Sequence, residues 1–175
     1  ELAVDETELL GLLDSSAMLC NEPLFGLRLA AEQNLMVVGE LALSVTRQPS
    51  IAAALAYYDE HAHLHARGVS LQQHARGELA EASLSFDFTN NSGLLQLKQL
   101  SVCHLFNGLR VMVENSGQQL RYHLRQSRPV HAQWQWAIPA GQVQFDSHLD
   151  GVSFPASWLG RSPRGLETLV TEHLE

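Results

Sequence analysis

The feature that most constrains the fold is residues 93–115, GLLQLKQLSVCHLFNGLRVMVEN, whose spacing of apolar residues predicts one long helix. On a helical wheel the polar residues of one narrow side are Gln96, Gln99, Asn107 and Arg110. Most of the remaining circumference is apolar, and a helix of this kind has to be covered by other elements. We therefore expect this helix to be largely buried, with the rest of the chain folded around it.

Three polar residues fall on the apolar side of this helix, at Lys98, Ser101 and His104. An unpaired buried lysine is costly, so Lys98 is expected to reach the rim, meet an internal acid, or face a cavity. In the last case the three side chains would line a ligand pocket, which typically places a few polar contacts in apolar walls. The sequence leaves these interpretations open.

The pattern along the chain changes at Gly68. Before it, four segments have helical spacing: 5–20 (with Leu9, Leu12, Leu13 and Met18 in register), 21–33, 37–48, and 50–68 with Ser50 as N-cap and Gly68 as the stop. After it, alternating residues predict a hairpin of strands at 69–76 and 79–88, then further strands at 120–126, 141–145 and 150–155. Between these strands, 130–138 is a short segment of helical type, and 164–175 has helical spacing again. The expected fold class is α+β, with N-terminal helices followed by a mainly antiparallel sheet packed on the long buried helix.

Length and composition describe one globular domain. The chain has 175 residues, 45% of them hydrophobic and 17% charged, which suits an ordinary packed core. We divide it into a helical part (1–66), a sheet with the long helix (67–160), and the start of a linker helix (161–175). A formal net charge of −8 argues against nucleic-acid binding by this chain alone, because phosphate contacts need basic surface. No apolar stretch is long enough to predict a membrane span, and two cysteines make no disulfide framework.

The segment YYDEHAHLHARG (57–68) carries three histidines near the end of a predicted helix. The wheel places His61 and His65 near the core-facing side, as an i, i+4 pair, and His63 away from it. Two imidazoles do not complete a zinc site, so we expect no bound metal; a metal-dependent sensor or enzyme using His61 and His65 is the less favoured alternative. Histidines also suit a helix C-terminus, where their positive charge meets the helix dipole.

Aromatic residues add two further candidates for a binding site. Tyr58 lies on the core-facing stripe of the same helix, and Trp134 lies in HAQWQWAI. Aromatic rings with one polar edge suit both the rim of a core and a ligand cage. The candidate ligand-binding residues are Lys98, Ser101, His104, Tyr58, His61, His65 and Trp134.

Catalytic and cofactor motifs are absent from the sequence. It has no glycine-rich phosphate loop, no His-Glu-x-x-His, no Gly-x-Ser-x-Gly and no paired zinc-ligand cysteines. Cys103 and His104 are neighbours on a helix and point about 100° apart, so they cannot form a nucleophile–base pair directly. We therefore expect a binding domain without a cofactor and without enzymatic activity.

Short motifs in the order seen here are typical of one family. They are Gly26-Leu27-Arg28-Leu29, Gly39, Pro49-Ser50, Ala54-Leu55, a hairpin, Val143-Gln144-Phe145, Val152-Ser153-Phe154-Pro155 and Trp158-Leu159. In this order the chain resembles the effector-binding N-terminal domain of AraC-type transcription regulators, the arabinose-binding-like branch. It departs from the family pattern at Gln142-Val143, where Pro-Val is usual, and at Ala30, where a second glycine is usual.

The resemblance implies a cytoplasmic bacterial regulator whose N-terminal domain senses a small molecule and often dimerises. A DNA-binding part with helix-turn-helix motifs is then expected beyond residue 175, so the expected partners are a small-molecule effector, a second copy of the chain, and DNA only through that part. No membrane partner is implied, and the family label does not identify the effector. The alternative function is a ligand-free dimerisation or interaction domain.

Overall fold

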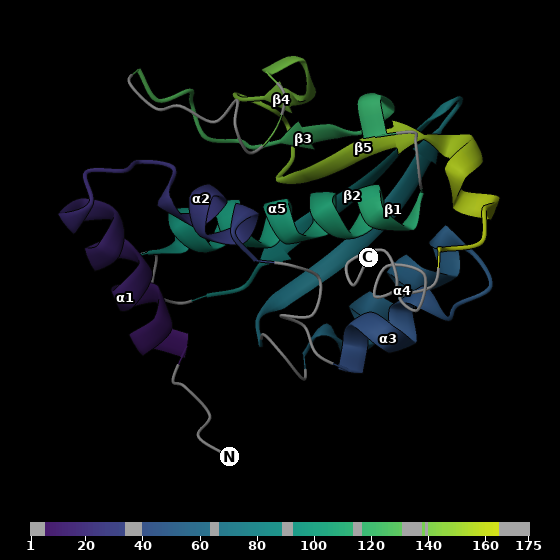
Figure 1. Ribbon diagram of the computed structural model, residues 1–175, viewed down its shortest axis with the longest axis horizontal. Coiled ribbons are helices and arrows are strands. Elements are labelled where there is room, and N and C mark those ends of the chain that lie inside the picture. The colour runs from purple at the N-terminus through teal and green to yellow at the C-terminus, as the bar shows by residue number, and fades with distance from the viewer. Residues whose placement is uncertain are drawn as a thin grey trace, which may run out of the picture.

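The computed structural model describes residues 6–33, 40–63, 67–88, 93–113, 117–130, 138 and 140–164 of the chain. Its N-terminal part is helical, as predicted (Figure 1). The helices are α1 (Glu6–Leu19), α2 (Phe25–Ala31), α3 (Glu40–Thr46) and α4 (Ile51–Ala62). Ser50 caps α4 as expected, because its hydroxyl accepts a hydrogen bond from the Ala53 amide at 3.2 Å. The predicted stop at Gly68 is wrong, since α4 ends at Ala62; Gly68 has φ 78° and lies in the turn before the first strand.

The strands form one sheet in the order β1-β2-β5-β3-β4. They are β1 (Val69–Arg76), β2 (Leu79–Phe86), β3 (Arg121–His123), β4 (Val143–Gln144) and β5 (Gly151–Pro155), with 3₁₀ turns η2 (Gly117–Gln119), η3 (Ala140–Gln142) and η4 (Ala156–Gly160). Neighbouring strands are antiparallel except β3 and β4, which are parallel. The α+β class with a mainly antiparallel sheet is therefore confirmed. The predicted segments 130–138 and 164–175 lie almost wholly outside the described residues.

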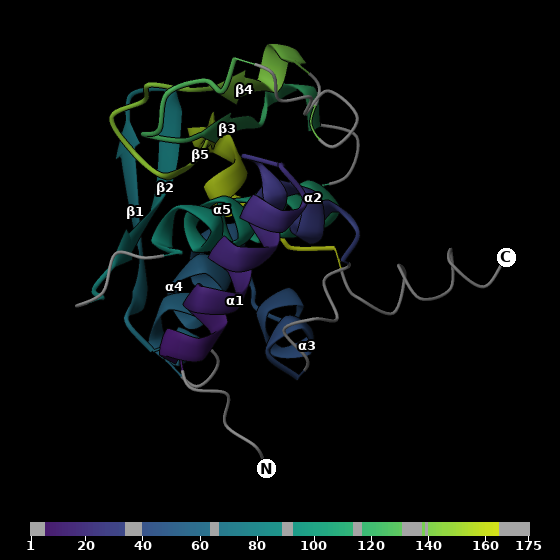
Figure 2. The ribbon, with the colours of Figure 1, turned by 90° about the vertical axis from the view of Figure 1, so that its left-hand side faces the viewer.

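The long helix α5 (Leu94–Met112) lies at the centre of the molecule, also as predicted. It packs on β2, β3 and β5, while α4 packs on β1. In Figure 2 both helices lie on the inner side of the strands. The strands alternate accordingly: Val69 and Leu71 are buried toward the helices, and Ser70 and Gln72 are exposed on the other face. The core between these layers contains Val102, Phe106, Leu109, Tyr122, Val152, Phe154 and Trp158.

The polar side of α5 is not turned to solvent along its first half, because α2 covers it. Gln96 is 4% exposed and Gln99 is fully buried. Their side-chain oxygens accept hydrogen bonds from the amides of Gly26 (2.9 Å) and Leu27 (3.4 Å), and the amide group of Gln99 donates to Pro23 O at 3.0 Å. The amides in the first turn of α2 are thus bonded by glutamine side chains of α5, since the N-cap residue of α2 makes no side-chain hydrogen bond to them.

The first helix is confirmed, but most of the residues whose spacing predicted it are exposed. Leu10, Leu13 and Ala17 are buried, and Leu10 and Leu13 pack on Leu97 of α5. The large apolar residues exposed on α1 are Leu9, Leu12, Met18 and Leu19. Of the four residues that had predicted the helix, only Leu13 is in the core.

In the described part of the chain, none of the helices is long and apolar enough to cross a membrane.

Candidate functional site

Lys98 lies on α5 where that helix passes the end of β2. Its ammonium is 3.5 Å from Asp150 Oδ2 and 5.8 Å from the centre of the Phe86 ring. The lysine side chain is 28% exposed and the aspartate side chain 6%. Lys98 is therefore paired with an internal acid, which was one of the expected outcomes, and its side chain remains partly exposed. It is also the one lysine in the 175 residues.

Asp150 connects three parts of the fold at the start of β5. Besides the contact with Lys98, its Oδ1 accepts a hydrogen bond from the Arg125 amide at 2.9 Å. Its backbone carbonyl accepts a bond from the Leu84 amide of β2 at 2.8 Å. A buried carboxylate with such partners keeps its charge compensated. The pair Lys98–Asp150 therefore ties α5 to the sheet and to the segment that follows β3.

The other two candidates on α5 do not share the contacts of Lys98. Ser101 is half-buried. His104 is half-buried as well, and its Nε2 is 2.8 Å from Gln33 Oε1, just after α2. Burial lowers the pKa of His104, since the charged imidazolium loses solvation there. The three residues form a half-buried line on α5, with Lys98 directed toward Asp150 and His104 toward the end of α2.

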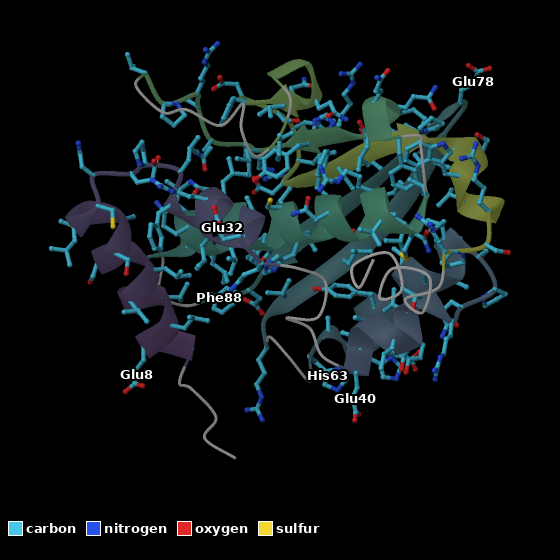
Figure 3. All side chains as sticks on the ribbon, viewed as in Figure 1. Glu8, Glu32, Glu40, His63, Glu78 and Phe88 are labelled. Carbon is cyan, nitrogen blue, oxygen red and sulfur yellow. The ribbon has the colours of Figure 1, made fainter. Side chains whose placement is uncertain are left out.

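The candidates on α4 have mostly local contacts. His61 stacks on Tyr57 with ring centres 4.0 Å apart, and its Nδ1 donates to Tyr57 O at 2.9 Å. Tyr58 is half-buried, and burial raises its pKa. His63 is exposed, as predicted, and points away from the molecule in Figure 3. His65 and Trp134 lie outside the described residues.

Within the described ranges, no group of three or more histidine, cysteine or acidic side chains is arranged to hold a metal ion. His61 contacts Tyr57, one helical turn earlier, through its Nδ1 and through its ring. Such local contacts are typical of a residue near the end of a helix.

Comparison with known proteins decides the family. Residues 1–162 match the family described as the arabinose-binding domain of AraC transcription regulators, N-terminal. The chain belongs to this family. Among solved structures it is similar to the transcriptional regulator CdpR from Pseudomonas aeruginosa, with a TM-score of 0.63 and 12% sequence identity. The match covers 93% of this chain and 59% of that protein, and at this identity it shows a shared fold. No curated protein sequence gives a significant match.

This AraC-family domain has a buried polar centre that the sequence did not reveal, on the outer face of the sheet. His123 of β3 is 6% exposed, and its two ring nitrogens lie 3.0 Å from Ser147 Oγ and 2.8 Å from Ser153 Oγ. The nearby pair His148–Glu81 has its Nε2 and Oε1 3.2 Å apart. Loss of solvation lowers the pKa of His123, the nearby Glu81 carboxylate raises it, and the neighbouring His148 and Arg121 lower it.

Asp150 and His123 were missed for the same reason. Asp150 lies in SHLDG, which was interpreted only as a turn before a strand, and its lysine partner is far away in the sequence. His123 lies in a short strand whose alternation places it on the outer face. The pairing of β3 with β5 aligns His123 with Gly151 and Arg121 with Ser153, and so places His123 beside the strand that carries Ser153. No local pattern in the sequence predicts that register.

The AraC-family domain also has a shallow groove of about 730 Å³ at the tip of the β1–β2 hairpin. It is lined by Arg76, Gly77, Glu78, Leu79, Gln119, Pro155, Ala156 and Ser157. None of the candidate ligand-binding residues that the structure describes belongs to this lining. Glu78, at this tip, lies at the far end of the molecule from α1 (Figure 3).

Proposed function

We propose that this chain is the small-molecule-sensing and dimerisation domain of a cytoplasmic bacterial AraC-type regulator. DNA would be bound by a part of the full protein outside these residues, in keeping with the net charge of −8. Family membership over residues 1–162 supports a regulatory ligand-binding domain rather than an enzyme. The family name does not make arabinose the effector of this chain.

The observation that carries the sensing proposal is the partly exposed ion pair of Lys98 and Asp150. The lysine side chain is 28% exposed, and its ammonium lies 5.8 Å from the centre of the Phe86 ring. An anionic group of an effector, most simply a carboxylate, can approach this cation and compete with Asp150 for it. The half-buried side chains of Ser101 and His104 on the same helix would supply polar contacts further along the effector.

The mechanism we propose is a population shift. An effector that binds Lys98 weakens the contact of Lys98 with Asp150, and Asp150 in turn fixes the start of β5 through its bonds to Leu84 and Arg125. The effector therefore binds two arrangements of α5 and the sheet with different affinity, which is the requirement for a ligand-driven change. That change would alter the surface of the domain that the rest of the regulator contacts.

A binding screen tests this proposal. Organic carboxylates, each matched with its neutral amide, would be added to the chain while its thermal unfolding is followed. A ligand at about 100 times its dissociation constant adds about 2.7 kcal/mol, which raises the unfolding temperature by several degrees. Stabilisation by a carboxylate and not by its amide supports an anionic effector. No stabilisation by any compound would favour the alternative, a ligand-free dimerisation domain.

Variants then assign the site. Lys98→Met removes the charge but keeps the length of the side chain, and it should weaken binding of the carboxylate at least tenfold. Arg76→Met removes one positive charge from the exposed hairpin tip and should leave binding unchanged. Because Lys98 is the one lysine, reductive methylation with ¹³C labels only its amine and the chain's N-terminal amine. If the carboxylate binds but the resonance of the Lys98 methyl groups does not shift, the effector binds elsewhere.

A further inference from the structure

The outer side of α1 is an apolar surface without a partner in the described part of the molecule. Leu12 is 63% exposed, Met18 77% and Leu19 87%, with Leu9 at 37%. We call these four residues the α1 patch. Single exposed leucines are ordinary, but large apolar side chains gathered on one short helix mark an interaction surface.

The α1 patch is presented by a helix that is held firmly on the domain. Leu10 and Leu13 are buried against Leu97. Gly93, at the start of α5, allows the close approach, because a Cβ there would clash with the carbonyl of Leu10, and its φ is 73°. The exposure of the patch is therefore a property of a docked helix whose inner side is already in the core.

The sequence of α1 is complementary to itself when two copies run antiparallel. Leu12 and Leu19 are seven residues apart, so they lie on the same side of the helix, about 10 Å apart along its axis. The two small residues Ser15 and Ser16 lie midway between them. A two-fold axis passing between these serines brings Leu12 of each copy against Leu19 of the other, and the serines let the backbones approach closely.

Charge favours the antiparallel arrangement over the parallel one. The acidic residues of α1 are Glu6, Glu8 and Asp14, and no lysine, arginine or histidine lies in this helix. Glu8 points away from the molecule in Figure 3. In a parallel pair the two Glu8 carboxylates would face each other, whereas in the antiparallel pair they lie at opposite ends, beyond the range of strong repulsion.

We infer that the α1 patch is the surface by which two copies of this chain associate, with their first helices antiparallel. This inference rests on the dimerisation named in the proposed function and adds the surface. Leu12 and Leu19 face the two-fold axis, whereas Leu9 and Met18, nine residues apart, lie on opposite flanks of the helix. The pair of helices therefore buries less than the roughly 1,000 Å² that full burial of all four side chains in both copies would give, which is small for a specific interface. The dimer is therefore expected to be reversible and dependent on concentration.

Sedimentation velocity over a range of concentrations tests the surface. The unmodified 175-residue chain should pass from monomer to dimer, and the double variant Leu12→Ser, Leu19→Ser should stay monomeric. Both leucines are exposed, so the fold is expected to survive, which circular dichroism checks. Leu79→Ser removes an exposed leucine from the hairpin at the opposite end and should leave the dimer intact.

Cysteine cross-linking tests the orientation. In a Cys20→Ser background, which removes the exposed cysteine, Ser16→Cys lies next to the proposed axis and should give a cross-linked dimer with a short thiol reagent. Glu8→Cys lies far from the axis and should not.

The outcomes separate the two levels of the proposal. If the unmodified chain remains a monomer throughout, dimerisation itself fails and the α1 patch with it. If it dimerises and the double leucine variant does so equally, dimerisation stands and the α1 patch is the wrong surface. Cross-linking through Glu8→Cys and not through Ser16→Cys would overturn the antiparallel arrangement.

Discussion

At the scale of single residues, the pair Lys98–Asp150 shows how one carboxylate serves both stability and the proposed sensing. Asp150→Ala leaves the Arg125 amide without its acceptor and Lys98 without its counter-ion. We expect a loss of about 2–4 kcal/mol in the free energy of unfolding, measured by urea titration. Asp150→Asn keeps an acceptor oxygen for the amide and should lose less. Equal losses in both variants would mean that the backbone bond contributes little.

His123 predicts a pH dependence of stability. Its folded-state pKa is lowered mainly by burial, so between that value and the ordinary value near 6.5 the unfolded chain binds more protons. Stability is therefore fully present above about pH 6.5 and falls as the pH is lowered toward the folded-state pKa. His104 acts in the same direction.

The measurement is the free energy of unfolding of the unmodified chain and of His123→Gln at about pH 7 and at about pH 5. The unmodified chain should lose more stability on acidification than the variant does. His63→Gln, which alters an exposed histidine, serves as the control and should behave like the unmodified chain. An identical loss in all three proteins would exclude His123 as a source of the pH dependence.

At the scale of elements, the contact of α2 with α5 depends on one glycine. A Cβ at Gly26 would clash with the backbone carbonyl of Gln96, and both belong to helices whose positions are fixed by buried hydrogen bonds. Gly26→Ala is expected to cost about 2–4 kcal/mol or to prevent folding, because the backbones have to separate.

Gly11 in α1 is the control for Gly26, because it has room for a side chain. Nothing lies within 4 Å of a Cβ built there, so alanine adds helix propensity without a clash. Gly11→Ala should raise the free energy of unfolding by about 0.5–1 kcal/mol, as judged by chemical denaturation. Stabilisation by Gly26→Ala, or destabilisation by Gly11→Ala, would contradict this account of the two glycines.

Most elements could be predicted from the sequence because their signals are local. The hairpin follows from alternation over 69–76 and 79–88, although its second strand ends at Phe86, and α5 follows from a long helical period. The buried side of α1 could not be predicted, since leucines surround most of that helix and only its neighbours decide which of them are covered. The burial of Gln96 and Gln99 was unexpected for a related reason: their hydrogen-bond partners belong to α2, which is distant in sequence.

At the scale of the whole molecule, α5 is the element through which effector binding and the α1 patch would be linked. It carries Lys98 in its first turns and contacts α1 and α2 there as well as the sheet. Under the proposed function, a change in the contact of Lys98 with Asp150 would act on α1 through the helix that both contact.

Association predicts a stability that depends on protein concentration. If only the folded chain dimerises, the midpoint of thermal unfolding should rise as the protein is concentrated. The variant Leu12→Ser, Leu19→Ser should show a midpoint independent of concentration over the same range. Differential scanning calorimetry at several concentrations makes this comparison, and a constant midpoint for the unmodified chain would count against a dimer.

The sequence by itself determined the fold class, the order of the elements, the central position of the long helix, and the family resemblance that residues 1–162 confirm. These follow from periodicity and from short motifs in order, which are properties of neighbouring residues. Only the tertiary structure decided that Lys98 meets Asp150, that His123 lies between two serines, and which side of α1 stays exposed. These contacts join residues far apart in the chain, and their partners depend on strand register and helix packing, which no local pattern specifies.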